Sequence, residues 1–179
     1  MLNPCHRLES SLPVCHAPSI LTVEETQKAM DWLRVHPKWL AWFALSAFAG
    51  LRPEEAAGSE WKAINFTEGS VTVEAQTSKM RQRRVVYPLP MCMAWLKEAK
   101  RLKSTLPLTV KARTIGLRLL TVVLGWPEWK SDVTRHSAAS YWLAQCGSAA
   151  TVATALGHSE SILRKNYMAL VRIPGAVGQ

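Results

Sequence analysis

LGHSESILRKNY, residues 156–167, places Tyr167 nine residues after His158. A tyrosine phenol has a pKa of about 10 and is a poor nucleophile unless a neighbouring group helps. Nearby cations lower that pKa because they favour the phenolate. Taken alone, the histidine could simply cap a helix and the tyrosine could simply pack on one. Residues 156–167 therefore indicate a nucleophilic tyrosine only if cationic partners occur elsewhere in the chain.

Two arginines upstream supply such cations. Arg52 lies in AGLRPEE, residues 49–55, and Arg135 lies in TRHS, residues 134–137. Guanidinium groups meet phosphate oxygens with paired donors and stay charged at neutral pH. The ordinary alternative for the first arginine is an ion pair with Glu55, three residues further along a helix. Together with the tyrosine, the arginines favour attack of a phenolic oxygen on a phosphodiester, whose non-bridging oxygens gather negative charge.

The composition is that of a folded, basic protein of one domain. The chain has 179 residues, of which 48% are hydrophobic and 20% charged, and its net charge is +9. This surplus favours a polyanionic partner, nucleic acid first and an anionic membrane second, over a merely solvated basic surface. No stretch of about 18 apolar residues and no apolar signal core occurs. The expected localisation is therefore the cytoplasm, in association with the nucleoid.

The cysteines are scattered and contain no Cys-x-x-Cys pair, which is typical of a reduced, intracellular protein. Two of them precede a histidine, at residues 5–6 and 15–16. This repeated pair could indicate zinc, but structural zinc sites usually use other spacings. We therefore expect no zinc site at these pairs.

The periodicity predicts a mainly α (α+β) fold, with helices around a small antiparallel β-sheet. Thr22 and Glu25 match a capping box at the start of a first helix. Alternating and β-branched residues over 70–87, with a basic middle, predict a hairpin. Ser131 and Gly147 are the expected cap and stop of a later helix. The expected helices cover 23–35, 39–49, a short segment from Pro53, 91–103, 109–124, 131–146, 148–156 and 160–171.

The motifs resemble, in their order, those of the catalytic domain of the tyrosine recombinases, the phage-integrase family. The matching elements are AGLRPEE, TSK at residues 77–79, RHS at 135–137, LGHS at 156–159, and the tyrosine nine residues after the histidine. The resemblance implies a helical tyrosine-recombinase catalytic domain over residues 21–172. Residues 1–20 would be a flexible lead-in or the remnant of a linker, and residues 173–179 a short C-terminal tail.

The resemblance also implies a role for each motif residue. Tyr167 would attack the scissile phosphate and form a 3′-phosphotyrosine. Arg52 and Arg135 would hold the non-bridging oxygens. Lys79 would act as a general acid toward the leaving oxygen, and His158 would hydrogen-bond the phosphate. No metal or nucleotide would be needed, because the covalent linkage conserves the bond energy for religation.

Charged residues beside these motifs have expected roles as well. Glu55 would be structural and would orient the helix of the first arginine. Arg81, Arg83 and Arg84 belong to a basic run that we expect to follow the DNA backbone, although a solvated hairpin turn is the alternative. These three residues are the DNA-binding candidates.

Asp132 departs from the family's pattern, which commonly has a histidine three residues before the second arginine. A carboxylate there would repel a phosphate unless it were protonated or paired. Its structural alternative is an acidic group at a helix N-terminus, or an ion pair with Arg135. Only about 20 residues precede the expected domain, where family members carry a DNA-clamping domain. The chain is thus expected to be either a fragment or a minimal protein that binds DNA weakly.

The expected function is that of a site-specific DNA recombinase or integrase. Its partner would be double-stranded DNA, on which it would assemble as a tetramer. One alternative is a truncated or catalytically weakened DNA-binding relative. Others are a type IB topoisomerase-like nicking-closing enzyme and an unrelated helical regulator that uses its charge to bind nucleic acid.

Overall fold

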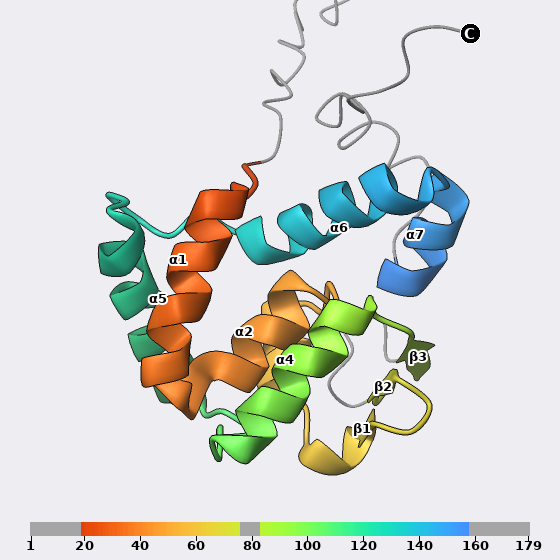
Figure 1. Ribbon diagram of the computed structural model, residues 1–179, viewed down its shortest axis with the longest axis horizontal. Coiled ribbons are helices and arrows are strands. Elements are labelled where there is room, and N and C mark those ends of the chain that lie inside the picture. The colour runs from red at the N-terminus through yellow and green to blue at the C-terminus, as the bar shows by residue number, and fades with distance from the viewer. Residues whose placement is uncertain (1–18, 76–82, 158–179) are drawn as a thin grey trace, which may run out of the picture.

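The computed structural model of the protein describes residues 19–75 and 83–157. Within these ranges, seven α-helices enclose a core and a three-stranded antiparallel sheet lies at one side (Figure 1). The mainly α fold with a small sheet, expected from the sequence, is confirmed. The elements are α1 (Val23–Val35), η1 (Pro37–Trp39), α2 (Leu40–Ala47), α3 (Pro53–Gly58), η2 (Trp61–Ala63), β1 (Ile64–Asn65), β2 (Ser70–Val73), β3 (Arg84–Val86), α4 (Pro90–Arg101), α5 (Val110–Leu124), α6 (Val133–Cys146) and α7 (Ala149–Leu156).

The core is built around α2, all of whose residues are buried. Its uniformly apolar sequence explains this position, because a helix that is apolar on every side has to be covered on every side. Helices α1, α3, α4 and α6 all pack against it. Trp42 and Phe43 fill the centre, and Trp142 from α6 joins the same core. Helix α2 therefore positions the short turn that leads into α3.

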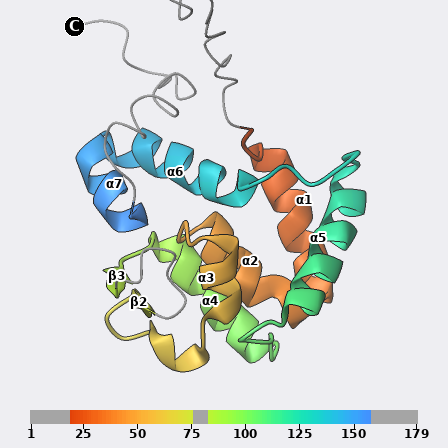
Figure 2. The same cartoon turned by 180° about the vertical axis from the view of Figure 1, so that it is seen from behind.

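Helices α1 and α5 lie together along one side of the molecule, where α5 and the segment directly after it contact both α1 and η1 (Figures 1 and 2). Thr22 and Glu25 form the expected capping box at the start of α1, and Glu25 also accepts a hydrogen bond of 2.8 Å from the indole of Trp126. Gly116 allows α5 to approach η1 closely, since a Cβ there would lie 2.6 Å from the ring of Trp39. These contacts fix the two helices relative to the core.

The sheet has the order β1-β2-β3, and the expected hairpin between β2 and β3 is confirmed. Val71 pairs with Val86, and both are buried on the same face. Strand β1 was not predicted, because two residues are too few to show an alternation. Its turn into β2 is held by Asn65, whose side-chain oxygen accepts the backbone N–H groups of Thr67 and Glu68, each at 3.0 Å.

The start of α6 differs from the prediction. The helix begins at Val133, and the residue at its N-cap is Asp132 instead of Ser131. Asp132 has a φ of 52°, a left-handed conformation that aspartate tolerates better than most residues, and its side chain makes no capping hydrogen bond. The predicted stop at Gly147 is confirmed. The helix expected over 160–171 lies outside the described residues, and the expected domain boundaries stay a prediction.

None of the helices within the described ranges combines the length and the apolar character that a membrane crossing requires.

Candidate functional site

Arg52 lies at the N-cap of α3, directly after the turn that ends α2. Its Nη1 donates to Oε1 of Glu55 at 3.0 Å, and its backbone N–H donates to Oε2 of the same carboxylate at 3.0 Å. The pairing three residues apart that the sequence suggested is therefore present. Pro53 starts the helix, which suits a residue without an N–H at the first helical position. The helix start holds both the backbone and the guanidinium of Arg52.

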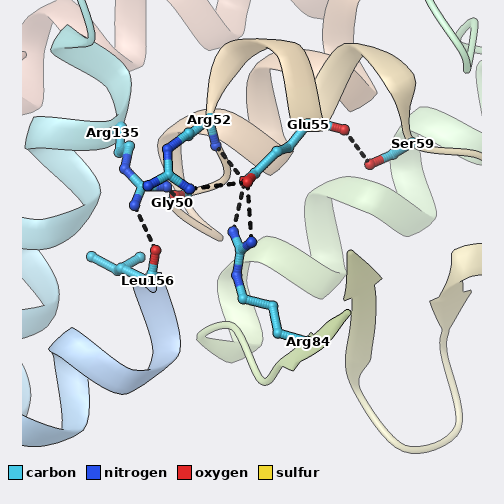
Figure 3. A network of polar contacts seen from close by, with 7 residues as sticks. All are labelled: Gly50, Arg52, Glu55, Ser59, Arg84, Arg135 and Leu156. Carbon is cyan, nitrogen blue, oxygen red and sulfur yellow. Dashed lines mark hydrogen bonds and ion pairs between the residues drawn. The ribbon is translucent and has the colours of Figure 1, made fainter. Parts of the chain in front are cut away.

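Glu55 is shared with a second arginine (Figure 3). Arg84, at the start of β3, donates from Nη1 to Oε1 at 3.0 Å and from Nη2 to Oε2 at 2.6 Å. The Glu55 side chain is only 1% exposed. Burial alone would raise its pKa, but the hydrogen bonds from Arg84 and from the backbone of Arg52 outweigh that effect, and the pKa of Glu55 is lowered. Glu55 is thus an ionised, buried link between two guanidinium groups.

Arg135 lies in the first turn of α6 and is 3% exposed. Its Nη1 donates to the backbone oxygen of Gly50 at 2.7 Å, and its Nη2 donates to that of Leu156 at 2.5 Å (Figure 3). The first contact reaches the turn two residues before Arg52, and the second reaches the last residue of α7. One side chain therefore joins the start of α3 to the end of α7. We call this set of bonds the Arg135 junction.

Gly50 lets these two segments meet. Its φ is 65°, and a Cβ there would lie 2.1 Å from Cδ2 of Leu156. Any larger residue would have both an unfavourable backbone conformation and a steric overlap. The close packing of Leu156 on this turn brings the end of α7 beside the segment that carries Arg52.

Gly157, the C-cap of α7, lies against Arg84. A Cβ at Gly157 would be 3.5 Å from Nε of that arginine, which is ordinary contact distance. Nε of Arg84 is buried and has no hydrogen-bond partner among the described residues. Gly157, which contacts Arg84, is the residue directly before His158 in the sequence.

The arrangement gathers three guanidinium groups in one cluster: two of them bond to the Glu55 carboxylate, and the third, from Arg135, bonds to the backbone beside them (Figure 3). They come from α3, β3 and α6, and the end of α7 closes the group. Three cations and one anion leave a net positive charge, which suits an anionic ligand such as a phosphate. The geometry brings together Arg52, Glu55, Arg84 and Arg135 among the residues selected from the sequence.

The remaining candidates are placed differently. Arg83 is 68% exposed, and its Nε lies 3.7 Å from a carboxylate oxygen of Glu74. Asp132 is exposed at the N-cap of α6, and its backbone oxygen accepts the N–H of His136 at 2.8 Å. Four candidates lie outside the described residues: Lys79, Arg81, His158 and Tyr167.

The neighbours of Arg135 in the TRHS motif serve the fold. Ser137 Oγ accepts the backbone N–H of Leu21 at 2.7 Å and donates to Val133 O at 2.7 Å, which ties α6 to the segment before α1. His136 is partly buried, and this burial lowers its pKa, against an opposing effect of the Asp132 carboxylate. Its imidazole is therefore biased toward the neutral form.

Within the described part of the chain, no group of three or more His, Cys, Asp or Glu side chains is placed to hold a metal ion. Cys92 is fully buried, and burial raises the pKa of its thiol to about 12, so it stays protonated. The two Cys-His pairs at residues 5–6 and 15–16 lie outside the described residues.

The sequence did not indicate two features of this site. The bidentate pair of Arg84 with Glu55 joins residues 29 positions apart. The contact of Gly50 with Leu156 joins two segments that are still further apart. One weak signal was available, since AGLRPEE contains a glycine directly after an apolar helix, where a positive φ is common.

The sequence matches no family model and no curated protein, whereas the fold matches solved structures. XerA recombinase matches with a TM-score of 0.67 and 19% identity, over 83% of this chain and 58% of that one. XerH site-specific recombinase, bound to palindromic difH substrate in a post-cleavage complex, matches with a TM-score of 0.63 and 17% identity, over 86% and 52%. A lambda integrase dimer bound to a COC′ core site matches with a TM-score of 0.64 and 18% identity, over 87% and 49%.

The chain has the fold of a tyrosine recombinase catalytic domain. At identities of 17–19% this likeness is one of fold. The chain spans about half the length of these three solved recombinases, between 49% and 58%. Within this recombinase fold, the arginine cluster is the candidate functional site.

Proposed function

We propose that the chain is a DNA strand-transferase, a site-specific recombinase or integrase that cuts and rejoins double-stranded DNA through a phosphotyrosine. The Arg135 junction carries this proposal. It joins the turn before Arg52 to the residue two positions before His158, inside a recombinase fold. Two further arginines, Arg52 and Arg84, share the buried carboxylate of Glu55 in the same cluster and add to its positive charge.

The proposed reaction assigns one step to each group. Tyr167 loses its phenolic proton to solvent, its oxygen forms a bond to the phosphorus, and the bond from phosphorus to the 5′ oxygen breaks. Lys79 donates a proton to that leaving oxygen, and His158 hydrogen-bonds the phosphate. Arg52 and Arg135 balance the charge that builds up on the non-bridging oxygens. The products are a 3′-phosphotyrosine and a 5′-hydroxyl, and the reverse reaction reseals the strand without a metal or a nucleotide.

The proposed partner is double-stranded DNA, bound through the basic surplus of the chain. A net charge of +9 favours a polyanion, and Arg81 and Arg83 belong to the basic run that would follow the backbone. The exposure of Arg83 is consistent with this role. A lambda integrase of the same fold was solved as a tetramer bound to a Holliday junction. We extend that assembly to this chain as part of the proposal.

Asp132 favours a second candidate, a relative that binds DNA with weakened chemistry. It occupies the position where the family commonly has a histidine, and it is exposed at the start of the helix that carries Arg135. A carboxylate there would repel the phosphate. In the main proposal Asp132 lowers the rate; in the second it marks a protein that only binds.

A suicide-substrate assay separates the two candidates. Nicked duplexes from the DNA that flanks the gene are incubated with wild type, Tyr167→Phe and Asp132→His. The intensity of the denaturant-stable protein–DNA band is then measured on a gel. We expect a band from wild type, none from Tyr167→Phe and a stronger one from Asp132→His. A gel shift serves as the control, because all three variants should bind DNA to a similar extent.

An equal covalent yield from Tyr167→Phe would overturn the assignment of the nucleophile. No band from any variant, despite measurable DNA binding, would favour the binding-only relative. Relaxation of supercoiled DNA of any sequence would instead favour a nicking-closing enzyme.

A further inference from the structure

We infer that Arg84 is a positioning residue that sets the orientation of Arg52 through Glu55, and not a DNA contact. This inference rests on the proposed function. It differs from the expectation that the whole basic run follows DNA. The observation behind it is the bidentate contact, with one carboxylate held between two arginines from α3 and β3.

The geometry of the contact is restrictive. A guanidinium that meets a carboxylate with two parallel bonds fixes the plane and the direction of that carboxylate. Arg84 is only 18% exposed and Glu55 only 1%, so water cannot easily replace either partner. Arg84 itself is anchored, because it pairs with Val73 in the β2–β3 ladder. The sheet therefore sets the carboxylate to which Arg52 binds.

Arg84 also reduces the share of the Glu55 negative charge that Arg52 neutralises. With both arginines present, the carboxylate is divided between two cations, and Arg52 keeps positive charge for a phosphate. Without Arg84, the whole carboxylate would fall to Arg52, which would turn toward it and lose part of its attraction for the substrate. A change at Arg84 is thus transmitted to Arg52 although the two guanidinium groups need not touch.

Arg84 is close to two further parts of the proposed site, one along the sequence and one in space. It lies five positions after Lys79 in the sequence, at the start of the strand that follows the basic run. Its Nε faces Gly157, the residue before His158. The Arg84 side chain therefore contacts both α3 and the end of α7. Arg84 is also the first residue of β3, the strand that follows Lys79 in the sequence.

The test measures single-turnover cleavage at saturating suicide substrate for Arg84→Met and Arg84→Lys, each with and without Glu55→Gln. We expect Arg84→Met to slow cleavage by about 10- to 100-fold, the size of effect that a small misplacement produces. The Kd for DNA and its salt dependence should stay at the wild-type values. Arg84→Lys should lie between, because an ammonium cannot form the bidentate contact.

The double mutant decides how Arg84 acts. If it acts through Glu55, Arg84→Met should cause little further loss in the Glu55→Gln background. Additive losses, together with weaker DNA binding and a shallower salt dependence, would overturn the inference in favour of a DNA contact. Arg101→Met is the matched control, since it removes another bidentate contact, with Glu98 on α4, away from the cluster. It should leave the cleavage rate unchanged.

A failure of the proposed function would look different. If wild-type protein forms no covalent complex, the contact is tested by carboxyl NMR titration of Glu55. An upward shift of the Glu55 pKa in Arg84→Met would support the inference that Arg84 holds the Glu55 carboxylate. An unchanged pKa would overturn that inference. Arg84→Lys, which keeps the charge, serves the same test if Arg84→Met does not fold.

Discussion

Because of Glu55, the free energy of unfolding depends on pH in the acidic range. Its pKa is lowered in the folded state, so it contributes stability that is present above its unfolded pKa of about 4.3 and is lost as pH falls through the folded pKa. We expect Glu55→Gln to reduce the free energy of unfolding by about 3 kcal/mol at neutral pH, because two arginines lose their ionised partner. Urea unfolding of both proteins at a series of pH values measures this difference.

The difference between wild type and Glu55→Gln should be constant between about pH 6 and 8 and should shrink below about pH 4. Other carboxylates titrate in both proteins and cancel in the difference. A difference that stayed constant down to about pH 3 would contradict the ionised link between the two arginines.

Arg52→Ala and Arg135→Ala should have similar effects on activity but different effects on stability. Either change to alanine should slow cleavage by about 3 kcal/mol or more of transition-state stabilisation, if the proposed function holds. Only Arg135→Ala should strongly destabilise the fold, since it leaves the buried carbonyls of Gly50 and Leu156 without this donor, at about 1–3 kcal/mol each. Single-turnover kinetics and urea unfolding give the two quantities. Equal stability of the two variants would argue against the Arg135 junction.

At the scale of elements, the contact between α7 and the turn after α2 depends on a missing side chain. Gly50→Ala should destabilise the protein by the left-handed backbone cost of about 1–2 kcal/mol and by a further 1–3 kcal/mol, roughly, for the overlap with Leu156. Gly69→Ala is the matched control, because its φ is 67° and a Cβ there meets nothing within 4 Å. Thermal or urea unfolding compares the two. Equal losses would show that Leu156 yields easily.

The elements themselves could largely be predicted, because their signals are local. The capping box at Thr22, the proline at the start of α3 and the glycine after α6 each act within a few residues, and the structure confirms all three. The cap of α6 was predicted one residue too early, because serine and aspartate are about equally common at an N-cap and the left-handed conformation of Asp132 leaves no local pattern. Strand β1 has too few residues to leave a pattern.

The site could be predicted only in part, for the same reason. The pair of Arg52 with Glu55 is one helical turn long and follows from the sequence. The charge of Arg84 predicted a DNA contact, but its partner is Glu55, 29 residues away in the sequence, and no local pattern encodes that contact. The resemblance to recombinases predicts Arg52 and Arg135 as site residues, whereas the contacts that hold them follow only from the fold.

At the scale of the whole molecule, the basic surplus should make DNA binding sensitive to salt. Under the proposed function, Arg83→Gln should reduce the slope of log K against log salt concentration by about 1, because the exposed guanidinium would neutralise one phosphate. Arg34→Gln removes the same charge from the last turn of α1 and is the control for a general effect. Fluorescence anisotropy over a series of salt concentrations measures both slopes. Identical slopes for the two variants would remove Arg83 from the DNA surface.

The Arg135 junction also has a consequence for the order in which the chain folds. Its bonds close sequence separations of 85 and 21 residues. Joining distant segments costs more chain entropy than forming a helix, and contacts of long sequence range slow folding. Refolding from urea should therefore recover helical circular dichroism before it buries Arg135. A chain emerging from the ribosome cannot complete the cluster until Leu156 has left the exit tunnel.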